Sequence, residues 1–568
     1  MIEFNPSPPS SDKHQHHHQH SFKMYLSLQT AALLALLPAL TVAQNDIPYQ
    51  PCPLLRAYYP LPTINASSEA IQSASATFTK LFDNLIETGC SDDFGCISPN
   101  TTSFSLVLYS VDGDATDDNY IFFKYSHIVP SLAGNGNTVD QDTVFPTGTL
   151  TQVFTVYAWI IQMGDGRWEE PITAFLPDLA TVNSTGSLSV NWEDVTIGSL
   201  AGHLSGIVRE SYACQAGSEC SYRDFLNQLT SYAPYTLPDT TPILSNAAFQ
   251  LLAFAIEQSS TKKCNATDFG SILSESFLGP LNMANSGLLS ASNEATVFGG
   301  DFSSSFVGEP AALSLLSTTR DLARAGRAML ASKLISASAT RRWLQPYSDT
   351  SNLRNSVGRP WEIYHAGQYA NSTILDVFTK NGYVGAYASY FGLSPDLGAG
   401  FAILSHDTSG TAADLNAYAD IVSLVLLNLE SLAAEEAASY FGGNYTNSSS
   451  DIAVIDSPSD GYGFVVSSLV VDGVDLRNKT AVAAGIELEN LDYRIYPSNV
   501  ASDTQHLFLA VFQDITAPVD AGTPTCITWQ DVGTLGADVA EQFVFGVDKE
   551  GVATTMTILG KNTTLQRE

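Results

Sequence analysis

Positive charge is the scarcest feature of this 568-residue chain. Lysine and arginine together number 25 against 58 aspartates and glutamates, which gives a formal net charge of −33 at pH 7. A field of that sign repels phosphate groups, so we expect no nucleic-acid partner and no attraction to anionic membranes. Apolar residues make up 44% of the chain and charged residues only 15%, which is enough apolar material for large cores. The length predicts more than one domain.

Several motifs that carry chemistry are also absent. The chain has no Cys-x-x-Cys pair, no Gly-x-Ser-x-Gly and no His-x-His-x-Asp run. These absences count against a zinc site, a nucleophile-elbow hydrolase and a metal-dependent lactamase. A histidine-rich run at residues 14–20 lies upstream of an export signal, so we expect it to have no role in the mature protein. The sequence therefore predicts no metal and no cofactor.

The N-terminus predicts export. Residues Tyr25–Ala43 have a short apolar centre, Ala31–Leu37, and end in small side chains, which is typical of a secretory signal cut after Ala43. The apolar centre is too short for a spanning helix. Either Met1 or Met24 could be the start of the chain. No further apolar stretch of spanning length is expected, so we predict a secreted protein with no membrane segment after cleavage.

Sequons and cysteines suit an oxidising, glycosylating compartment. Asn-x-Ser/Thr sequons occur over the whole length, at Asn65, Asn100, Asn183, Asn265, Asn371, Asn444, Asn447, Asn478 and Asn562. The seven cysteines include two close pairs, Cys90/Cys96 and Cys214/Cys220, which are the predicted disulfides. An odd number leaves at least one thiol free or paired between chains.

Hydrophobic periodicity predicts an α+β unit followed by an all-β unit. Helices are expected at 66–88, 149–162, 247–257, 317–331 and 414–438, and strands at 104–109, 120–125, 387–391 and 400–404. Past Gly442 come short strand-like runs at 452–455, 464–471, 481–488, 506–512, 526–529, 541–547 and 554–559. We therefore divide the chain into residues 1–43 (extension and signal), 44–440 and 441–568 (a β-rich domain).

Five short sequence elements support a family resemblance because of the order in which they occur along the chain. They are Phe145-Pro-Thr-Gly-Thr149-Leu-Thr-Gln152, Gly164-Asp-Gly-Arg-Trp168, His203-Leu-Ser-Gly206, Leu244-Ser-Asn246 and Lys380-Asn381-Gly382. Together they resemble the serine β-lactamase and penicillin-binding-protein superfamily, and most of all its secreted fungal β-lactamase-like branch with a C-terminal β-domain. The opening after the signal at Cys52 and the stretch Pro360-Trp361-Glu362-Ile363 resemble the same branch. The resemblance implies a β-lactamase/transpeptidase-like fold.

The chain departs from the family pattern at the catalytic positions. The resemblance places Thr149 where relatives have the nucleophilic serine, Gln152 where they have the basic lysine, and Leu244 where they have the relay tyrosine. A carboxamide does not titrate near neutral pH, and leucine carries no exchangeable proton. The family's binding positions remain as Asn246 and the set Lys380, Asn381 and Gly382. We therefore expect acyl-enzyme chemistry to be weak or absent.

Three functional hypotheses follow. The first is a catalytically impaired scaffold in which Lys380 and Asn246 hold a small molecule with a carboxylate, ester or lactam group. The second is an altered enzyme that uses Thr149, either an amide, ester or lactone hydrolase or a cyclase or isomerase that tailors a secondary metabolite. The third is a structural secreted glycoprotein. His203, His365 and His406 are candidate replacement bases, but the sequence favours a structural role for each.

Overall fold

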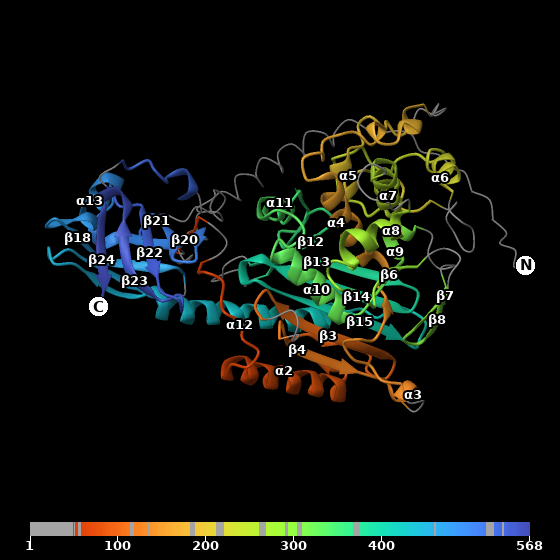
Figure 1. Ribbon diagram of the computed structural model, residues 1–568, viewed down its shortest axis with the longest axis horizontal. Coiled ribbons are helices and arrows are strands. Elements are labelled where there is room, and N and C mark those ends of the chain that lie inside the picture. Colours follow the sequence, from red (N-terminus) through yellow and green to blue (C-terminus); the bar gives the residue numbers. More distant parts are fainter. Residues whose placement is uncertain are drawn as a thin grey trace, which may run out of the picture.

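The computed structural model describes residues 49, 51–54, 58–113, 119–133, 137–181, 188–211, 221–260, 268–289, 294–303, 309–366, 375–458, 462–517, 528–536 and 539–568. A mixed body and a smaller β-rich domain lie end to end along the long axis of the molecule (Figure 1). The predicted export signal lies outside these residues, as do Asn183, Asn265, Asn371, Cys214, Cys220, Cys264 and Cys526.

An antiparallel sheet of eight strands forms the centre of the body. Its strands, in spatial order, are β10 (Ser348–Asp349), β11 (Asn355–Val357), β12 (Glu362–Ala366), β13 (Leu375–Val384), β14 (Tyr387–Ser394), β15 (Ala399–Asp407), β3 (Thr102–Ser110) and β4 (Ile121–His127). Strands β3 and β15 are buried along their whole length. Both faces of these strands are buried because helices cover both sides of the sheet.

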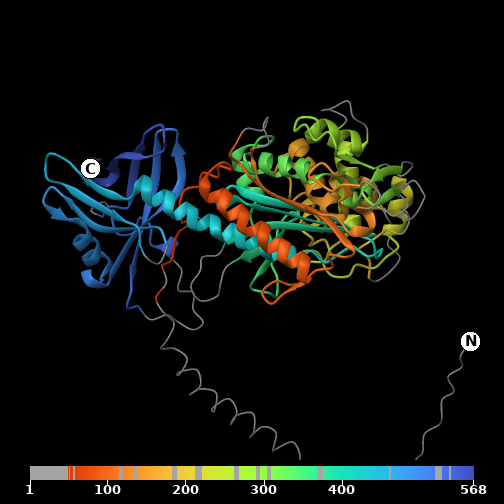
Figure 2. The same ribbon diagram turned by 90° about the horizontal axis from the view of Figure 1, so that it is seen from below.

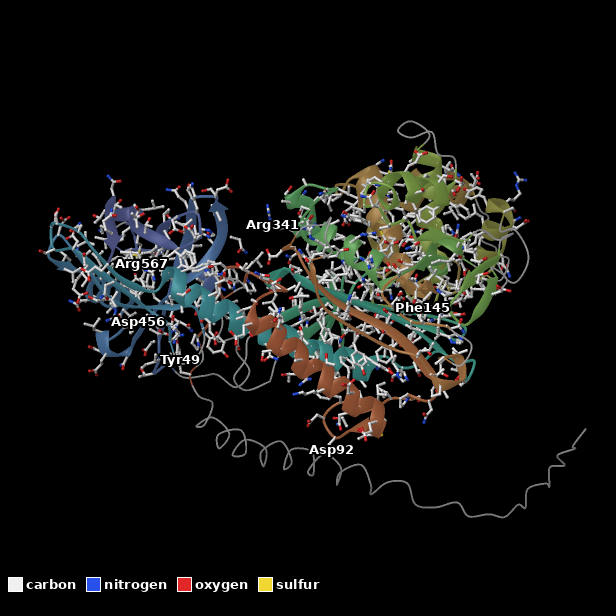
Figure 3. All side chains as sticks on the ribbon, turned by 60° about the horizontal axis from the view of Figure 1, so that its bottom comes forward. Tyr49, Asp92, Phe145, Arg341, Asp456 and Arg567 are labelled. Atoms are coloured by element: carbon white, nitrogen blue, oxygen red, sulfur yellow. A yellow bond between two sulfur atoms is a disulfide. The ribbon has the colours of Figure 1, made fainter. Side chains whose placement is uncertain are left out.

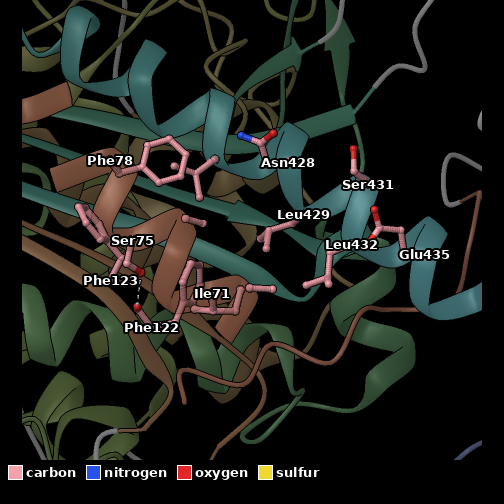
Figure 4. A pocket seen from close by; sticks show the side chains of 13 residues that line it. Ile71, Ser75, Phe78, Phe122, Phe123, Asn428, Leu429, Ser431, Leu432 and Glu435 are labelled. Carbon is pink, nitrogen blue, oxygen red and sulfur yellow. Dashed lines mark hydrogen bonds between the residues drawn. The ribbon is translucent and has the colours of Figure 1, made fainter. Parts of the chain in front are cut away.

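Two long helices cover one face of the sheet. Helix α2 (Glu69–Thr88) begins at the N-cap Ser68 and ends at Gly89, which has a left-handed conformation (φ 75°). It lies beside the first half of α12 (Asn416–Phe441), and both pack on β3 and β4. Between them remains an apolar pocket of about 190 Å³, lined among others by Phe78, Phe122 and Leu429 (Figure 4).

A layer of helices covers the opposite face. It contains α4 (Thr151–Met163), α5 (Ile197–Ala201), α6 (Tyr222–Leu229), α7 (Asn246–Ser260), α8 (Phe269–Leu273), α9 (Pro310–Leu313), α10 (Thr319–Leu330) and α11 (Ala337–Trp343). Helix α4 is buried on nearly all sides, which explains why its sequence is apolar without a polar stripe. The largest core cluster lies between this layer and the sheet. Short strands β5 (Phe145–Pro146), β6 (Gly287–Leu288) and β9 (Leu315–Ser317) and the hairpin β7 (Glu294–Val297) and β8 (Gly300–Ser303) complete this side.

The C-terminal domain is a closed antiparallel barrel. Its strands follow the order β17 (Ile452–Asp456), β16 (Gly443–Thr446), β24 (Thr563–Arg567), β23 (Ala553–Ile558), β22 (Gln542–Val547), β21 (Gln505–Asp514), β20 (Leu491–Ser502) and β18 (Phe464–Val471). Pairing of β17 with β18 closes the ring, and β19 (Val474–Asp475) extends β18 before helix α13 (Leu476–Ala484). Closure removes free sheet edges.

Helix α12 joins the two domains physically. Its first half packs on the body's sheet, and its last turns carry Ala433, Ala437 and Phe441 into the barrel's core (Figure 2). The Arg567 guanidinium donates hydrogen bonds to the carbonyls of Ser439 (2.8 Å) and Gly442 (2.6 Å) at the C-terminus of α12. A cation at that end satisfies free carbonyls and complements the helix dipole.

The N-terminal part of the described chain lies on the barrel rather than on the body. Tyr49 donates a hydrogen bond to Asp492 of β20, and the Cys52 amide donates one to Gln513 (2.7 Å) (Figure 3). Tyr59 packs edge-on against Phe464 in the barrel core. The barrel therefore holds the first described residues as well as the C-terminal strand.

Helix α12 contradicts the expectation that no second apolar stretch of spanning length exists. By length and composition alone it could cross a membrane, although half of its most apolar window is buried inside the protein. Its contacts with the sheet and with the barrel explain that apolar composition. A core helix of a globular protein meets the same criterion, so α12 is weak evidence for a membrane segment.

Most predicted helices and strands are confirmed, with two exceptions. The expected strand at residues 481–488 is wrong, because α13 occupies Leu476–Ala484 and ends at Gly485 with φ 69°. Asp475 caps the helix by accepting from the amides of Arg477 and Asn478, so both cap signals were present in the sequence. Part of the expected strand at 526–529 is instead a 3₁₀ turn, Thr528–Gln530. The Cys90–Cys96 disulfide is confirmed, and Cys52 is disulfide-bonded as well.

Candidate functional site

The site predicted from sequence lies where the start of α4 touches β13. Gly148 has φ 57°, and a side-chain Cβ there would lie 2.6 Å from the backbone of Tyr383. A Cβ on Gly382 would lie 2.2 Å from the carbonyl oxygen of Thr147. Only glycine at both positions allows this close approach. The approach brings Thr149 next to the Lys380-Asn381-Gly382 segment.

The Thr149 hydroxyl is committed to the backbone. It donates a hydrogen bond to the carbonyl of Asn381 (3.1 Å), and the residue is 6% exposed. Its proton therefore points at a carbonyl oxygen rather than at a base. Its lone pairs are the part of the hydroxyl that remains for another group.

Gln152 lies one turn further along and on the same side of the helix as Thr149. It is fully buried, and its amide nitrogen donates to the side-chain oxygen of Asn246 (2.9 Å), the first residue of α7. The Asn246 amide nitrogen in turn donates to the carboxylate of Glu210 (2.9 Å). The structure thus brings together Thr149, Gln152 and Asn246, while Leu244 lies half-buried before α7 and offers no polar atom.

The direction of this hydrogen-bond chain follows from its ionised end. A carboxylate only accepts, so Glu210 requires the amide nitrogen of Asn246 to point toward it. The oxygen of Asn246 then accepts from the amide nitrogen of Gln152. The side-chain oxygen of Gln152 is left buried and without a hydrogen-bond partner in the described part of the chain. The hydrogen-bond chain therefore ends at a hydrogen-bond acceptor, the side-chain oxygen of Gln152.

Glu309 extends the network and carries no signal in the sequence. It precedes α9, is fully buried, and accepts a hydrogen bond from the Ser211 amide (2.6 Å). Burial, with a smaller contribution from the nearby charge of Glu210, raises the pKa of Glu309 from 4.5 to about 8. Glu309 is therefore protonated at neutral pH, and its second carboxyl oxygen is buried without a hydrogen-bond partner in the described residues. Glu210 itself is one-third exposed and lies 3.6 Å from the guanidinium of Arg209.

Lys380 already has a counterion. The side chain is fully buried, and its ammonium forms an ion pair with Glu362, whose other oxygen accepts from the Asn381 amide (3.1 Å). Glu362 belongs to a stretch that supported the family resemblance, but its role as partner was not foreseen. The charge of Lys380 is therefore compensated within the protein.

His203 is also neutral. Burial in the first place, and the charge of Lys380 in the second, lower its pKa to about 4. One ring nitrogen donates to the carbonyl of Pro360 (2.9 Å), and the other is buried without a partner in the described residues.

The described residues place no titratable side chain in hydrogen-bond contact with Thr149 or Gln152. The closest carboxylate in the network, Glu210, lies two hydrogen bonds away from Gln152. No group of three or more His, Cys, Asp or Glu side chains suited to a metal occurs in the described ranges. The arrangement can accept hydrogen bonds and keep one carboxyl group, Glu309, protonated at neutral pH.

The β-lactamase family profile matches residues 113–454, which is more than half of the chain. The chain belongs to the β-lactamase family. A second profile, described as "Beta-lactamase-like-like, C-terminal domain", matches residues 433–568. The body thus has the β-lactamase/transpeptidase-like fold, and the barrel is the family's C-terminal domain.

Two proteins and one solved structure are examples of what the chain is similar to. A β-lactamase-like protein from Arthroderma benhamiae is 23% identical over 81% of this chain and 78% of its own length. A human protein named putative beta-lactamase-like 1 is 28% identical over 47% of this chain, and this chain spans about half of that relative (54%). A β-lactamase/D-alanine carboxypeptidase from Yersinia pestis aligns over 64% of this chain and 99% of its own, with 16% identity and a TM-score of 0.48.

Proposed function

We propose that this β-lactamase-family protein is secreted and binds a small molecule beside Thr149 without forming an acyl-enzyme. One observation carries the proposal. The position of the family's base is occupied by the Gln152 amide, which is bonded to Asn246 and cannot take a proton from Thr149. Removing catalytic residues that act together, such as a nucleophile and its base, typically lowers the catalytic rate by a factor of about 10⁴ to 10⁶.

The contacts narrow the ligand class that the sequence suggested. A carboxylate held by Lys380 is disfavoured, because Glu362 already pairs with that ammonium. Both polar atoms of the Asn246 side chain already have partners, because its nitrogen donates to Glu210 and its oxygen accepts from Gln152. What remains is the Gln152 oxygen and the lone pairs of Thr149, which are acceptors. We therefore propose a ligand that presents N–H or O–H donors, such as a lactam or amide N–H, rather than a carboxylate or an ester.

Secretion and glycosylation are part of the proposal and rest on the export signal and the sequons. The described sequons Asn65, Asn100, Asn444, Asn478 and Asn562 are exposed, as glycan acceptors must be. The side chain of Asn447 is instead bonded to Asp451 (2.8 Å), so we expect little glycan there. The Cys90–Cys96 disulfide is compatible with export.

A second candidate function is an altered enzyme, and one observation favours it. Glu210 and Glu309 are neighbouring carboxyl groups, and Glu309 holds a proton at neutral pH. A carboxyl group that its surroundings keep protonated at neutral pH can serve as a general acid. Such an enzyme would be a hydrolase, cyclase or isomerase of a secondary metabolite in which Thr149 positions the substrate.

Two measurements test the first proposal against the second. Intact-mass spectrometry after exposure to a β-lactam or an activated ester should show no adduct on Thr149, and a rapid adduct there would overturn the proposal. The triple variant Thr149→Ser, Gln152→Lys and Leu244→Tyr asks whether the scaffold becomes competent once a titratable amine returns.

Thermal stabilisation tests the ligand class. Phenylacetamide and phenylacetate share one apolar group and differ in the head group. We expect the amide to raise the melting temperature more than the carboxylate, and this difference to be lost in Gln152→Leu. Stronger stabilisation by the carboxylate would contradict the proposed polarity of the site. Turnover of an amide by the wild type, lost in Glu210→Gln, would favour the altered enzyme.

A further inference from the structure

Three side chains on neighbouring strands form a connected array away from Thr149. The ring nitrogen Nδ1 of His365 on β12 lies 2.6 Å from the Asp376 carboxylate on β13. Its other nitrogen, Nε2, lies 3.1 Å from the hydroxyl of Ser356 on β11. An ionised carboxylate can only accept a hydrogen bond, so Nδ1 carries the proton, and in the neutral ring the lone pair of Nε2 faces the serine hydroxyl.

The register of the sheet builds this array. His365 and Asp376 are directly opposite in the β12–β13 pairing. Ser356 is opposite Ile363, so His365 is its diagonal neighbour two residues along β12. Because side chains alternate along a strand, Asp376 shares a face of β13 with Phe378 and Lys380. Four residues of strand separate Asp376 from Lys380, roughly 13 Å at 3.3 Å per residue.

The three residues differ in their exposure to solvent. Asp376 is 1% exposed, which keeps its carboxylate fixed against the ring. The His365 side chain is 20% exposed and gives the array its contact with solvent. Ser356 is 1% exposed and directed at the ring nitrogen. Nucleophile, base and orienting carboxylate are recognised by this geometry, independently of their order in the sequence.

We propose that Ser356, His365 and Asp376 form a second, serine-hydrolase type of site, with Ser356 as nucleophile, His365 as general base and Asp376 as positioning residue. Its substrates are carboxylic esters. The apolar side chains of Ile363 and Phe378 lie on the same face beside the array and are packed into the core between the sheet and the helices. This reverses the structural role that the sequence favoured for His365.

The chemical step is an acyl transfer to Ser356. The Ser356 oxygen forms a bond to the ester carbonyl carbon while its proton passes to His365 Nε2. The bond to the leaving alkoxy group breaks, and that group takes the proton from His365 and departs as the alcohol. Water then attacks the acyl-serine, with His365 again accepting and returning the proton, and the carboxylic acid leaves.

A fluorophosphonate probe tests this site in the full-length protein. The serine oxygen bonds to phosphorus as fluoride leaves, so peptide mapping reports the nucleophile directly. We expect slow labelling of Ser356, because it is nearly buried, and no labelling at that peptide in Ser356→Ala. Asp376→Asn should slow labelling by about 10³ to 10⁴, because the imidazole then favours the wrong tautomer.

The controls separate this proposal from a structural role and from the Thr149 site. Ser405→Ala removes an equally buried serine of the same sheet, bonded to Ala388, and should leave labelling unchanged. Thr149→Ala should also leave the labelling of Ser356 unchanged. The proposal for the Ser356 site and the proposal for the Thr149 site can therefore fail independently. Mapping of the label to another residue, or no label on the wild type, would overturn the proposal. Wild-type mapping decides the question even if Ser356→Ala does not fold.

Discussion

Replacing Glu309 by glutamine should change how stability depends on pH. Its pKa is about 8 in the folded protein and 4.5 without the surrounding structure, so between these values only the folded state holds the proton. Stability then falls by about 1.4 kcal/mol per pH unit as the pH rises through this window. Over the whole window, the contribution of this proton to the free energy of unfolding is roughly 3–5 kcal/mol. That contribution is fully present below pH 4.5 and is lost by about pH 8.

Glutamine imitates the protonated side chain. Its oxygen can still accept from the Ser211 amide, and like the protonated acid it carries no charge. We therefore expect Glu309→Gln to match the wild type at about pH 5 and to be clearly more stable at about pH 8.5. Urea unfolding at a series of pH values measures this, with the exposed Glu275→Gln as the matched control. A constant difference between Glu309→Gln and the wild type across the series would refute the reasoning.

Three further predictions concern the same body. Glu362→Gln leaves the buried ammonium of Lys380 without its counterion and should destabilise the protein by about 2–3 kcal/mol in urea unfolding, whereas no loss would mean that the pair is not formed. Thr149→Ser alone should give no acyl adduct by mass spectrometry, because no base contacts this hydroxyl, and an adduct would show that a base reaches it. Replacing both Cys90 and Cys96 by alanine removes the disulfide that closes a short loop and should lower the free energy of unfolding by about 2 kcal/mol. Urea unfolding should show a lower midpoint, and the reduced wild-type protein should show the same decrease.

Local sequence patterns correctly predict most of the helices and strands of the fold. The spacing of apolar residues marks α2, and the uniformly apolar run of α4 marks a helix buried in the domain. The strand expected at residues 481–488 is wrong because apolar content alone does not distinguish a short strand from a helix, whereas Asp475 and Gly485 cap a helix there. Among the site residues, Thr149 and Gln152 could be placed because three residues along a helix always share a face.

By itself, then, the sequence determined the absence of a lysine at the base position and the order of elements that makes this a β-lactamase-family chain. Only the tertiary structure decided which side chains meet. Glu362 pairs with Lys380, Glu309 lies beside Glu210, and Ser356 reaches His365 because of strand register and loop packing. Such contacts join segments far apart in the chain, and periodicity within one segment carries no information about its partner in another.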